Sequence, residues 1–417
     1  MRLCVLNRRP AMVYLLAVAT CMAAAVSTLV ETTDSPSIVS EAGIAARLDA
    51  LYRDRAQAIV RGDTGNLASH YDLESAYGRW ALDREHRRTR YVEAWSKARG
   101  VRFVGASARI KVDAVEVRGD TAWLRLRQSA GFAYVHDADP HAPPDNFGIG
   151  TRHSVELVRR NGTWLVRRDW YTDPLDEDSI VADVRPSPDP TEGHAPKTQA
   201  PAPGEHGHSR ESTDTPHSAG TSASPGGHEG PVRPSVRQYD RARAVAYADR
   251  YCGFAWGGGN DGEYNPKYKD FTGLGGDCTN FVSQVLGDAD AGGLPMDWTW
   301  HYTLTGPGAG PSRAWAQAEA LVGYLIASGR ATRLARGTYP EVAAPLRQLA
   351  NGHVGALRPG DIVAYEERGR IQHLAIVTGT DSHGYIVVNS HTADRYHVPW
   401  DLGWDRGTVF WLLSITR

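Results

Sequence analysis

The spacing of apolar residues divides the chain into two structured stretches, each with helices first and strands later. From about residue 41 apolar side chains recur every three or four positions, which predicts a helix, and further helices are expected over 65–76 and 80–98. From residue 101 the period changes to two. This alternation predicts strands at 101–105, 108–118, 121–135, 149–159 and 163–171. Helices followed by an antiparallel meander indicate an α+β domain over 41–180.

The second stretch, residues 236–417, repeats this order and is also predicted to be α+β. Helical spacing covers 239–251, 278–287 and 314–328. The strands that follow are expected at 362–366, 372–379, 385–390 and 408–415.

Between the two stretches, residues 181–235 are rich in Pro, Ser, Thr, Gly, Glu and His and almost free of large apolar side chains. Such a segment cannot bury enough surface to offset its ordering entropy, so we expect a disordered linker. Its histidines have irregular spacing and no cysteine partners, which favours solvated side chains over a metal site. They are His194, His206, His208, His217 and His228.

The first 30 residues have the order of a secretory signal. Arg2, Arg8 and Arg9 precede an apolar run over 11–30, which contains small residues around Ala25. The run is also long enough to remain as an uncleaved membrane anchor. Either outcome predicts a secreted or cell-envelope-associated protein of bacterial type, with membrane contact only through this segment.

Net charge argues against nucleic acid as a partner, because 46 basic residues are balanced by 48 acidic ones. No His-Glu-x-x-His motif and no cysteine pairs at zinc spacing occur, so neither a metal nor a cofactor is expected. We expect a monomer that binds a peptide-like substrate.

The strongest chemical signal is Cys278, which opens a predicted helix after the turn Gly275-Gly276. Asp277 is expected to cap this helix by accepting the amides of residues 279 or 280. The positive end of the helix dipole should lower the pKa of the thiol and favour the nucleophilic thiolate. The alternative is a small buried cysteine that only packs. Cys252 is expected to be such a packed thiol, without a disulfide.

Polar side chains on two later strands could complete a catalytic group. His373 begins a predicted strand, where an imidazole could share a proton with the thiol, and the alternative is an ordinary histidine at a sheet edge. Asn389 and His391 lie on one face of the next strand, since strand side chains alternate. Either could orient the imidazole of His373.

The first stretch resembles the cone-shaped fold of nuclear-transport-factor-like and cystatin-like domains. That fold hosts both enzymes and adaptors, so it does not decide function. A His–Asp pair inside a cone could be catalytic, but core or surface roles are the simpler interpretation, and we expect a binding or spacer module. The candidate side chains are Tyr77, Trp80, His86, His153 and Asp169.

Five motifs within residues 236–417 carry a family resemblance: Tyr264-Asn265-Pro266, Gly276 to Gln284, Arg358-Pro359-Gly360-Asp361, His373 to Val377 and Ser390 to Arg395. They resemble the putative amidase domain family of secreted bacterial proteins, which is similar to papain-like cell-wall endopeptidases and the Cys-His amidohydrolase and peptidase group. In the first stretch, 77–80 and 150–153 also resemble the region that precedes this domain. The Gly-rich segment 253–262 looks longer than in the family.

The resemblance implies a papain-like α+β domain with Cys278 as nucleophile, His373 as general base and His391 as orienting residue, a role for which Asn389 competes. The amide of Cys278 is the first oxyanion donor expected, and Asp277 and Tyr268 are further candidates for oxyanion or substrate contacts.

The sequence therefore predicts an exported cysteine amidohydrolase or peptidase that cleaves amide bonds, with peptidoglycan peptides as substrate. An amine in place of water would make it a transferase. The alternative is a non-catalytic extracellular wall-binding or adaptor protein whose papain-like domain is inert.

Overall fold

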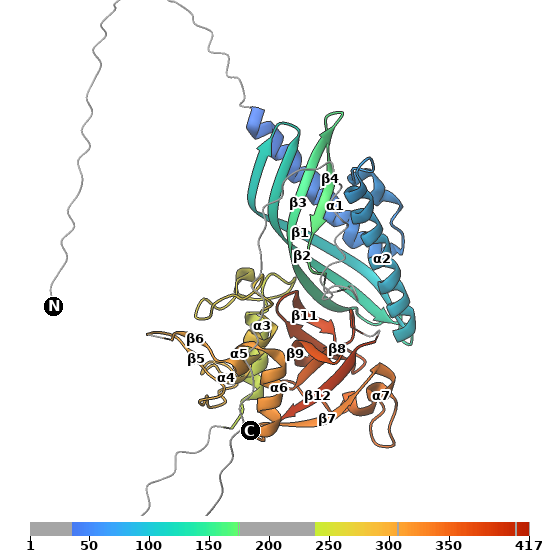
Figure 1. Cartoon of the computed structure of the whole chain (residues 1–417). Helices are drawn as coiled ribbons and strands as arrows, with labels where there is room; N and C mark the ends of the chain where they lie inside the picture. Colours follow the sequence, from blue (N-terminus) through green and yellow to red (C-terminus); the bar gives the residue numbers. More distant parts are fainter. Residues whose placement is uncertain (1–35, 174, 176–237, 307, 405–406, 417) are drawn as a thin grey trace, which may run out of the picture. The chain divides into compact units, whose positions relative to one another are not determined.

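The computed structural model describes residues 36–173, 175, 238–306, 308–404 and 407–416 (Figure 1). The predicted signal over 1–30 and the predicted linker over 181–235 lie outside the described residues. Contacts divide the chain into Met1–Gly43 and Ile44–Arg417, and the second unit contains both structured stretches. No helix within the described ranges combines the length and the apolar character needed to span a bilayer.

The N-terminal half, the described part of residues 41–180, consists of helices followed by a meander, as predicted. The helices lie against one face of the sheet, and Leu48, Tyr52, Leu124 and Leu157 pack between the two layers (Figure 1). The elements are α1 (Pro36–Arg61), η1 (Gly65–His70), α2 (Ala76–Arg99), β1 (Val101–Arg118), β2 (Thr121–His136), β3 (Asp145–Arg160) and β4 (Thr163–Trp170).

Two predicted boundaries in this half are wrong. The predicted helix over 65–76 is only the short 3₁₀ helix η1, and α2 begins after Ser75, whose side chain accepts the amide of Tyr77. The two predicted strands over 101–118 form the single strand β1, with irregularities near Gly105 and Ala114. A bulge shifts the register by one residue, which interrupts the alternation without ending the strand.

The C-terminal half, the described part of residues 236–417, follows the predicted order with additional elements. The expected elements are α3 (Arg241–Arg250), α4 (Cys278–Gly287), α5 (Arg313–Ala316), α6 (Ala318–Ala327), β8 (Ile362–Glu367), β9 (Arg370–Thr380), β10 (Ile386–Ser390) and β12 (Val409–Ile415). The predicted helix over 314–328 is interrupted at Gln317, which has extended backbone angles.

Several elements of this half were not predicted from the sequence. They are η2 (Asn260–Gly262), β5 (Tyr302–Thr303), β6 (Gly310–Pro311), β7 (Ala331–Gly337), α7 (Tyr339–Ala343), η3 (Gly352–Ala356) and β11 (Asp394–Pro399). Strand β11 has no apolar alternation because it buries Asp394 and Arg395 as well as Val398, so polar partners rather than hydrophobicity hold it in place.

One sheet runs through both halves. Its hydrogen-bonded path is β1-β2-β3-β11-β10-β9-β8-β12-β7, with β4 paired to β3 off the path, which makes ten strands. Strands β3 and β11 join the halves in antiparallel register, with Asp394 opposite Gly150 and Tyr396 opposite Gly148. Helix α4 packs on one face of β9, where Leu374 and other apolar side chains form a core with it.

The segment after α3 lies so close to the N-terminal sheet that only glycine fits beneath it. A Cβ atom at Gly148 would lie 1.8 Å from the carbonyl oxygen of Trp256, and one at Gly150 would lie 2.6 Å from the backbone of Phe254. A cavity of about 450 Å³ lies beside this contact, lined by Phe132, Trp256 and Tyr396 among others. The glycines therefore allow the backbones of the two halves to touch.

We predict that Gly148→Ala lowers the free energy of unfolding by about 1–3 kcal/mol, because the added methyl overlaps main-chain atoms that cannot rotate away. Gly379→Ala is the matched control, since a Cβ at that strand position meets nothing within 4 Å. It should change stability by less than about 0.5 kcal/mol. Urea unfolding of both variants measures the difference, and equal stabilities would contradict the close contact.

Candidate active site

Cys278 is the first residue of α4, as predicted, but the helix start is built differently from the prediction. Gly275 and Gly276 form the expected turn, with φ angles of 114° and 110°. The side chain of Asp277 makes no capping hydrogen bond. Instead the hydroxyl of Thr392 accepts the amides of Asp277 (2.8 Å) and Cys278 (3.2 Å). The cap therefore comes from a residue distant in sequence.

Thr392 adopts a backbone conformation that a β-branched residue rarely takes, with a φ angle of 85°. Such strain costs about 1–3 kcal/mol and persists only where the surroundings impose it. Here the surroundings include the two amides at the start of α4, which need an acceptor because a helix leaves its first amides unpaired. The strain therefore lies directly beside Cys278.

The carboxylate of Asp277 points away from the helix amides because other donors use it. One oxygen accepts the amide of Phe271 and the side-chain amide of Asn280, both at 2.9 Å. The other oxygen lies 2.6 Å from Nδ1 of His391. Asp277 is almost fully buried, at 1% exposure, so the donors around it compensate for lost hydration.

His391 is held on all sides. Its ring is stacked between Tyr264, at 3.7 Å between centroids, and Phe281, at 4.0 Å. Its Nε2 atom lies 2.5 Å from the carbonyl oxygen of Tyr251, and a carbonyl can only accept, so Nε2 carries a proton. Because Asp277 occupies Nδ1, neither nitrogen of His391 is free to accept from His373. Within the described ranges, the predicted hydrogen bond between these two imidazoles is therefore not formed.

The thiol of Cys278 does not have the lowered pKa that its helix position suggested. Burial raises its pKa, and the N–H of Leu374 and the hydroxyl of Thr279 only partly oppose the rise. Desolvation disfavours the thiolate more than the helix end favours it. Cys252 is likewise buried and not disulfide-bonded, as predicted, and burial raises the pKa of its thiol as well.

His373 lies at the start of β9, next to the residue whose N–H contacts the Cys278 sulfur. Its ring stacks on Trp404 at 5.1 Å and is 3% exposed. Burial, and then the charges of Arg395 and His391, hold its pKa well below the usual value. Within the described part of the chain, Nε2 of His373 is buried without a hydrogen-bond partner, and no hydrogen bond joins it to Cys278.

The remaining predicted site residues have other partners. The amide of Asn389 donates to Asp249 at 2.9 Å, and its oxygen accepts the backbone N–H of His397 at 2.7 Å. The hydroxyl of Tyr268 donates to Asp288 at 2.6 Å. Asp288 directly follows α4, so the Tyr268 hydroxyl binds at the end of the helix opposite to Cys278. The role of Tyr268 in oxyanion or substrate contacts stays a prediction.

The N-terminal half also contributes to this site, which the sequence did not indicate. Arg152 of β3 donates to the hydroxyl of Tyr264 at 3.1 Å, and Tyr264 stacks on His391. The same hydroxyl donates to Asp394 at 2.5 Å. Arg152, Tyr264, Thr392 and Asp394 all lie in the motifs that carry the family resemblance, and that position was the only available signal for them.

The candidate residues of the N-terminal half are only partly brought together. Nδ1 of His153 lies 2.8 Å from a carboxylate oxygen of Asp169, so these two residues form a pair. Arg55 forms ion pairs with both Asp169 and Glu85. Burial lowers the pKa of His153. Although burial opposes it, the pKa of Asp169 falls to about 2, because His153 and Arg55 stabilise the carboxylate.

This group is a buried, paired ionic cluster, which fits a role in the core. The other three candidates have separate environments. The ring of Tyr77 lies under Arg168, His86 contacts Thr64 at 2.5 Å, and Trp80 is partly exposed.

Comparison with known proteins gives a family match for the C-terminal half. Residues 238–413 match the family model described as "Putative amidase domain". The match supports a hydrolase that acts on amide bonds. None of the curated proteins compared with the chain matches it.

Several solved structures are similar to about a third of the chain. A "Putative Scytalone Dehydratase" from Novosphingobium aromaticivorans is 14% identical, with coverage of 32% of this chain and 84% of that chain and a TM-score of 0.23. A type 2 hexachlorocyclohexane dehydrochlorinase is 16% identical, with 33% and 89% coverage and a TM-score of 0.22. A Nostoc punctiforme protein of unknown function with a cystatin-like fold is 13% identical, with 32% and 90% coverage and a TM-score of 0.19.

These TM-scores lie below 0.5, so the cone-shaped assignment stays a prediction. Its support is the order of α1, α2 and the β1–β4 meander.

We predict that Thr392→Val lowers the free energy of unfolding by about 1–2 kcal/mol, because two amides at the start of α4 lose their acceptor. Thr392→Ser keeps the hydroxyl and should remain close to the wild type. Urea unfolding distinguishes the two variants. If valine is tolerated as well as serine, the hydroxyl does not cap the helix.

We predict that His373 makes the protein less stable in acid. The unfolded chain binds a proton at this residue below about pH 6.5, whereas the buried imidazole stays neutral, so stability falls as the pH decreases from that value. The contribution is about 1.4 kcal/mol per pH unit. His373→Gln should flatten the dependence of unfolding free energy on pH between 5 and 7.

The exposed His141 serves as the control, and His141→Gln should keep the wild-type slope. Identical slopes for wild type and His373→Gln would show that His373 does not stay neutral in the folded protein.

Proposed function

We propose that the chain is an exported cysteine amidohydrolase or peptidase in which Cys278 is the nucleophile and His373 is the general base. One observation supports this most. A buried Nε2 atom of His373 has no partner among the described residues, while the N–H of the next residue, Leu374, contacts the Cys278 sulfur. An unpaired buried nitrogen is costly, which suggests that it is kept for a reaction.

The protonation states fit a base and a nucleophile before substrate binds. A lowered pKa leaves the His373 imidazole neutral, which is the form that can accept a proton, and a raised pKa keeps the Cys278 thiol protonated. In this proposal the His373 ring turns from Trp404 toward the sulfur. The thiol proton then moves to Nε2 as the sulfur attacks the substrate carbonyl.

An acyl-enzyme then forms and is hydrolysed, with His373 as the proton carrier in both steps. The C–S bond forms while the carbonyl electron pair moves to oxygen. When that pair returns, the C–N bond breaks, and His373 gives its proton to the leaving amine. Water then attacks the thioester with His373 as base, which breaks the C–S bond and regenerates the thiol. An amine acceptor in place of water gives a transferase.

The amide of Cys278 is the proposed oxyanion donor. At present it donates to the hydroxyl of Thr392 at 3.2 Å, which is longer than the 2.8 Å bond from Asp277 to the same oxygen. A substrate oxyanion would replace this hydroxyl as the acceptor. An anion accepts a hydrogen bond more strongly than a hydroxyl does, so the exchange favours the tetrahedral intermediate.

His391 is proposed as a positioning residue that acts through Asp277, whereas the sequence predicted that it would orient His373 directly. It fixes Asp277, the residue directly before Cys278, and thereby the turn that carries the thiol. Asn389 instead holds Asp249 and the backbone of His397. His391→Ala is therefore expected to lower turnover more than Asn389→Ala, although neither side chain is hydrogen-bonded to His373 in the described part of the chain.

Peptidoglycan peptides are the proposed substrate, and a secreted or envelope location is proposed with them. The signal-like order of residues 1–30 and the resemblance to secreted cell-wall enzymes support both. The rival is an inert wall-binding adaptor. It is favoured by the lack, within the described ranges, of any hydrogen bond between the buried Cys278 and His373.

The experiment is incubation of the full chain with purified cell walls, followed by mass spectrometry of the soluble fragments. The proposal predicts fragments with new amino and carboxyl ends, at the mass of hydrolysis. Cys278→Ala should reduce their release at least about 10³-fold, because the nucleophile is lost. Cys252→Ala is the matched control and should retain release, since it removes a second buried thiol that takes no part in the proposed steps.

The outcomes separate the alternatives. Products that carry an added amine would indicate a transferase. Binding of the wild type to cell walls without any released fragment would support the adaptor. Equal release by the wild type and by folded Cys278→Ala would overturn the assignment of the nucleophile.

A further inference from the structure

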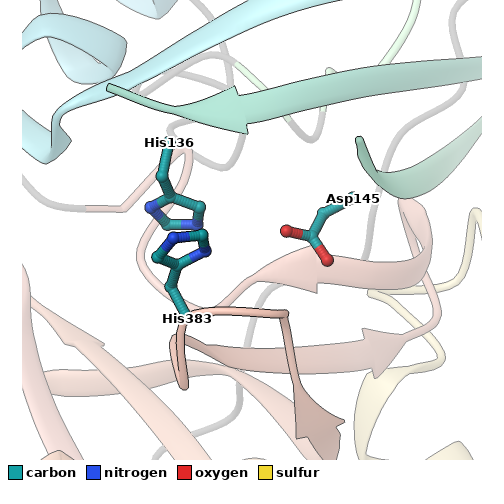
Figure 2. A group of neighbouring side chains, drawn as sticks. All are labelled: His136, Asp145 and His383. Atoms are coloured by element: carbon teal, nitrogen blue, oxygen red, sulfur yellow. The ribbon is translucent and has the colours of Figure 1, made fainter. Parts of the chain in front are cut away.

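Two histidines and an aspartate from distant parts of the chain meet at one edge of the sheet. His136 ends β2, Asp145 begins β3, and His383 lies in the turn between β9 and β10. One ligand atom from each lies within 4.8 Å of the others. Figure 2 shows the two imidazoles facing each other, with the Asp145 carboxylate directed toward them. The group therefore draws side chains from both halves.

The hydrogen bonds of His136 determine which of its nitrogens is available. Its Nε2 atom lies 2.7 Å from a carboxylate oxygen of Asp381, which also accepts from the hydroxyl of Tyr134. A carboxylate accepts, so Nε2 carries the proton and Nδ1 of the neutral ring keeps its lone pair. A carboxylate behind a histidine is the usual arrangement that orients a metal-binding imidazole.

The hydrogen bonds of Ser382 determine which nitrogen of His383 is available. The Ser382 hydroxyl donates to Asp145 at 2.6 Å, which uses its only proton. It can then only accept from Nδ1 of His383, at 2.8 Å, so Nε2 of the neutral His383 ring keeps its lone pair. Asp145 accepts from the amide and the hydroxyl of Ser382 and still has lone pairs to offer. Each of the three side chains thus retains an atom with a lone pair that can bind a metal ion.

We propose that His136, Asp145 and His383 bind a divalent transition-metal ion of the zinc type. Two imidazoles and one carboxylate suit Zn²⁺, Co²⁺ or Ni²⁺, whereas Ca²⁺ and Mg²⁺ prefer oxygen ligands alone. The rings now stack at 4.0 Å, so their lone pairs lie in nearly parallel planes. His383 is exposed and lies in a turn, so its ring can rotate to share one ion with His136.

The proposed ion has a structural rather than a catalytic position. His373 begins the buried part of β9 and His391 follows β10, whereas His383 lies in the turn at the other end of both strands. At about 3.3 Å per residue the turn is roughly 25 Å from His373. The ion would therefore link the turn of the C-terminal half to β2 and β3 of the N-terminal half.

The test is a titration of chelator-treated full-length protein with Co²⁺, read by its visible absorption, and with Zn²⁺, read by the melting temperature. We expect one Co²⁺ site with imidazole ligation and a rise in melting temperature with Zn²⁺, because the ion binds only the folded arrangement. His383→Gln should weaken Co²⁺ binding at least tenfold and abolish the rise. Because the His383 side chain is exposed, its replacement is not expected to impair folding.

His141→Gln is the matched control, since it removes an exposed histidine of the connection between β2 and β3 and should keep both signals. Asp145→Asn should weaken binding in the same direction as His383→Gln. The linker histidines are present in all three variants, so binding there cannot produce the difference. An unchanged Zn²⁺ response in His383→Gln, or no response in the wild type, would overturn the proposal. Neither readout depends on amide hydrolysis.

Discussion

The carboxylate of Asp394 lies where the two halves and the candidate active site meet. Asp394 of β11 pairs with Gly150 of β3, and Asp394 is 2% exposed. One oxygen accepts the amide of Phe254 at 2.9 Å, and the other accepts the hydroxyl of Tyr264 at 2.5 Å. A buried carboxylate is stable only with such donors, so the sheet, the glycine-rich segment and the ring stacked on His391 are mutually dependent.

Other buried aspartates of the C-terminal half join it to the N-terminal half in the same way. Asp381 accepts from Tyr134, and Asp401 accepts from the indole of Trp95 at 3.0 Å and from Arg99 at 2.8 Å. Each such bond strengthens in the low dielectric of the interior and would leave a buried charge if its donor were lost. The N-terminal half is therefore part of one structural unit with the amidase-like half, rather than a spacer that only the linker connects.

Burial also determines the chemistry available beside Cys278. Desolvation acts in opposite directions on an acid and a base, so it keeps the thiol protonated and the His373 imidazole deprotonated. Both side chains are therefore uncharged in this structure. Thr392 and His391 fix the start of α4, which carries the thiol, because Thr392 accepts the amides of Asp277 and Cys278 and His391 contacts the Asp277 carboxylate.

The sequence by itself determined the elements whose signals are local. Apolar spacing predicted α2, α4 and most of the strands, and the Gly275-Gly276 turn correctly located the start of the helix at Cys278. Only the tertiary structure decided which partners the polar side chains take. Three features depend on residues far apart in sequence: the cap from Thr392, the joining strand β11 and the group around His383. Apolar periodicity reports only local structure, so it cannot predict such contacts. The protonation of Cys278 depends on burial in the same way, because a helix start favours the thiolate only where water still reaches it.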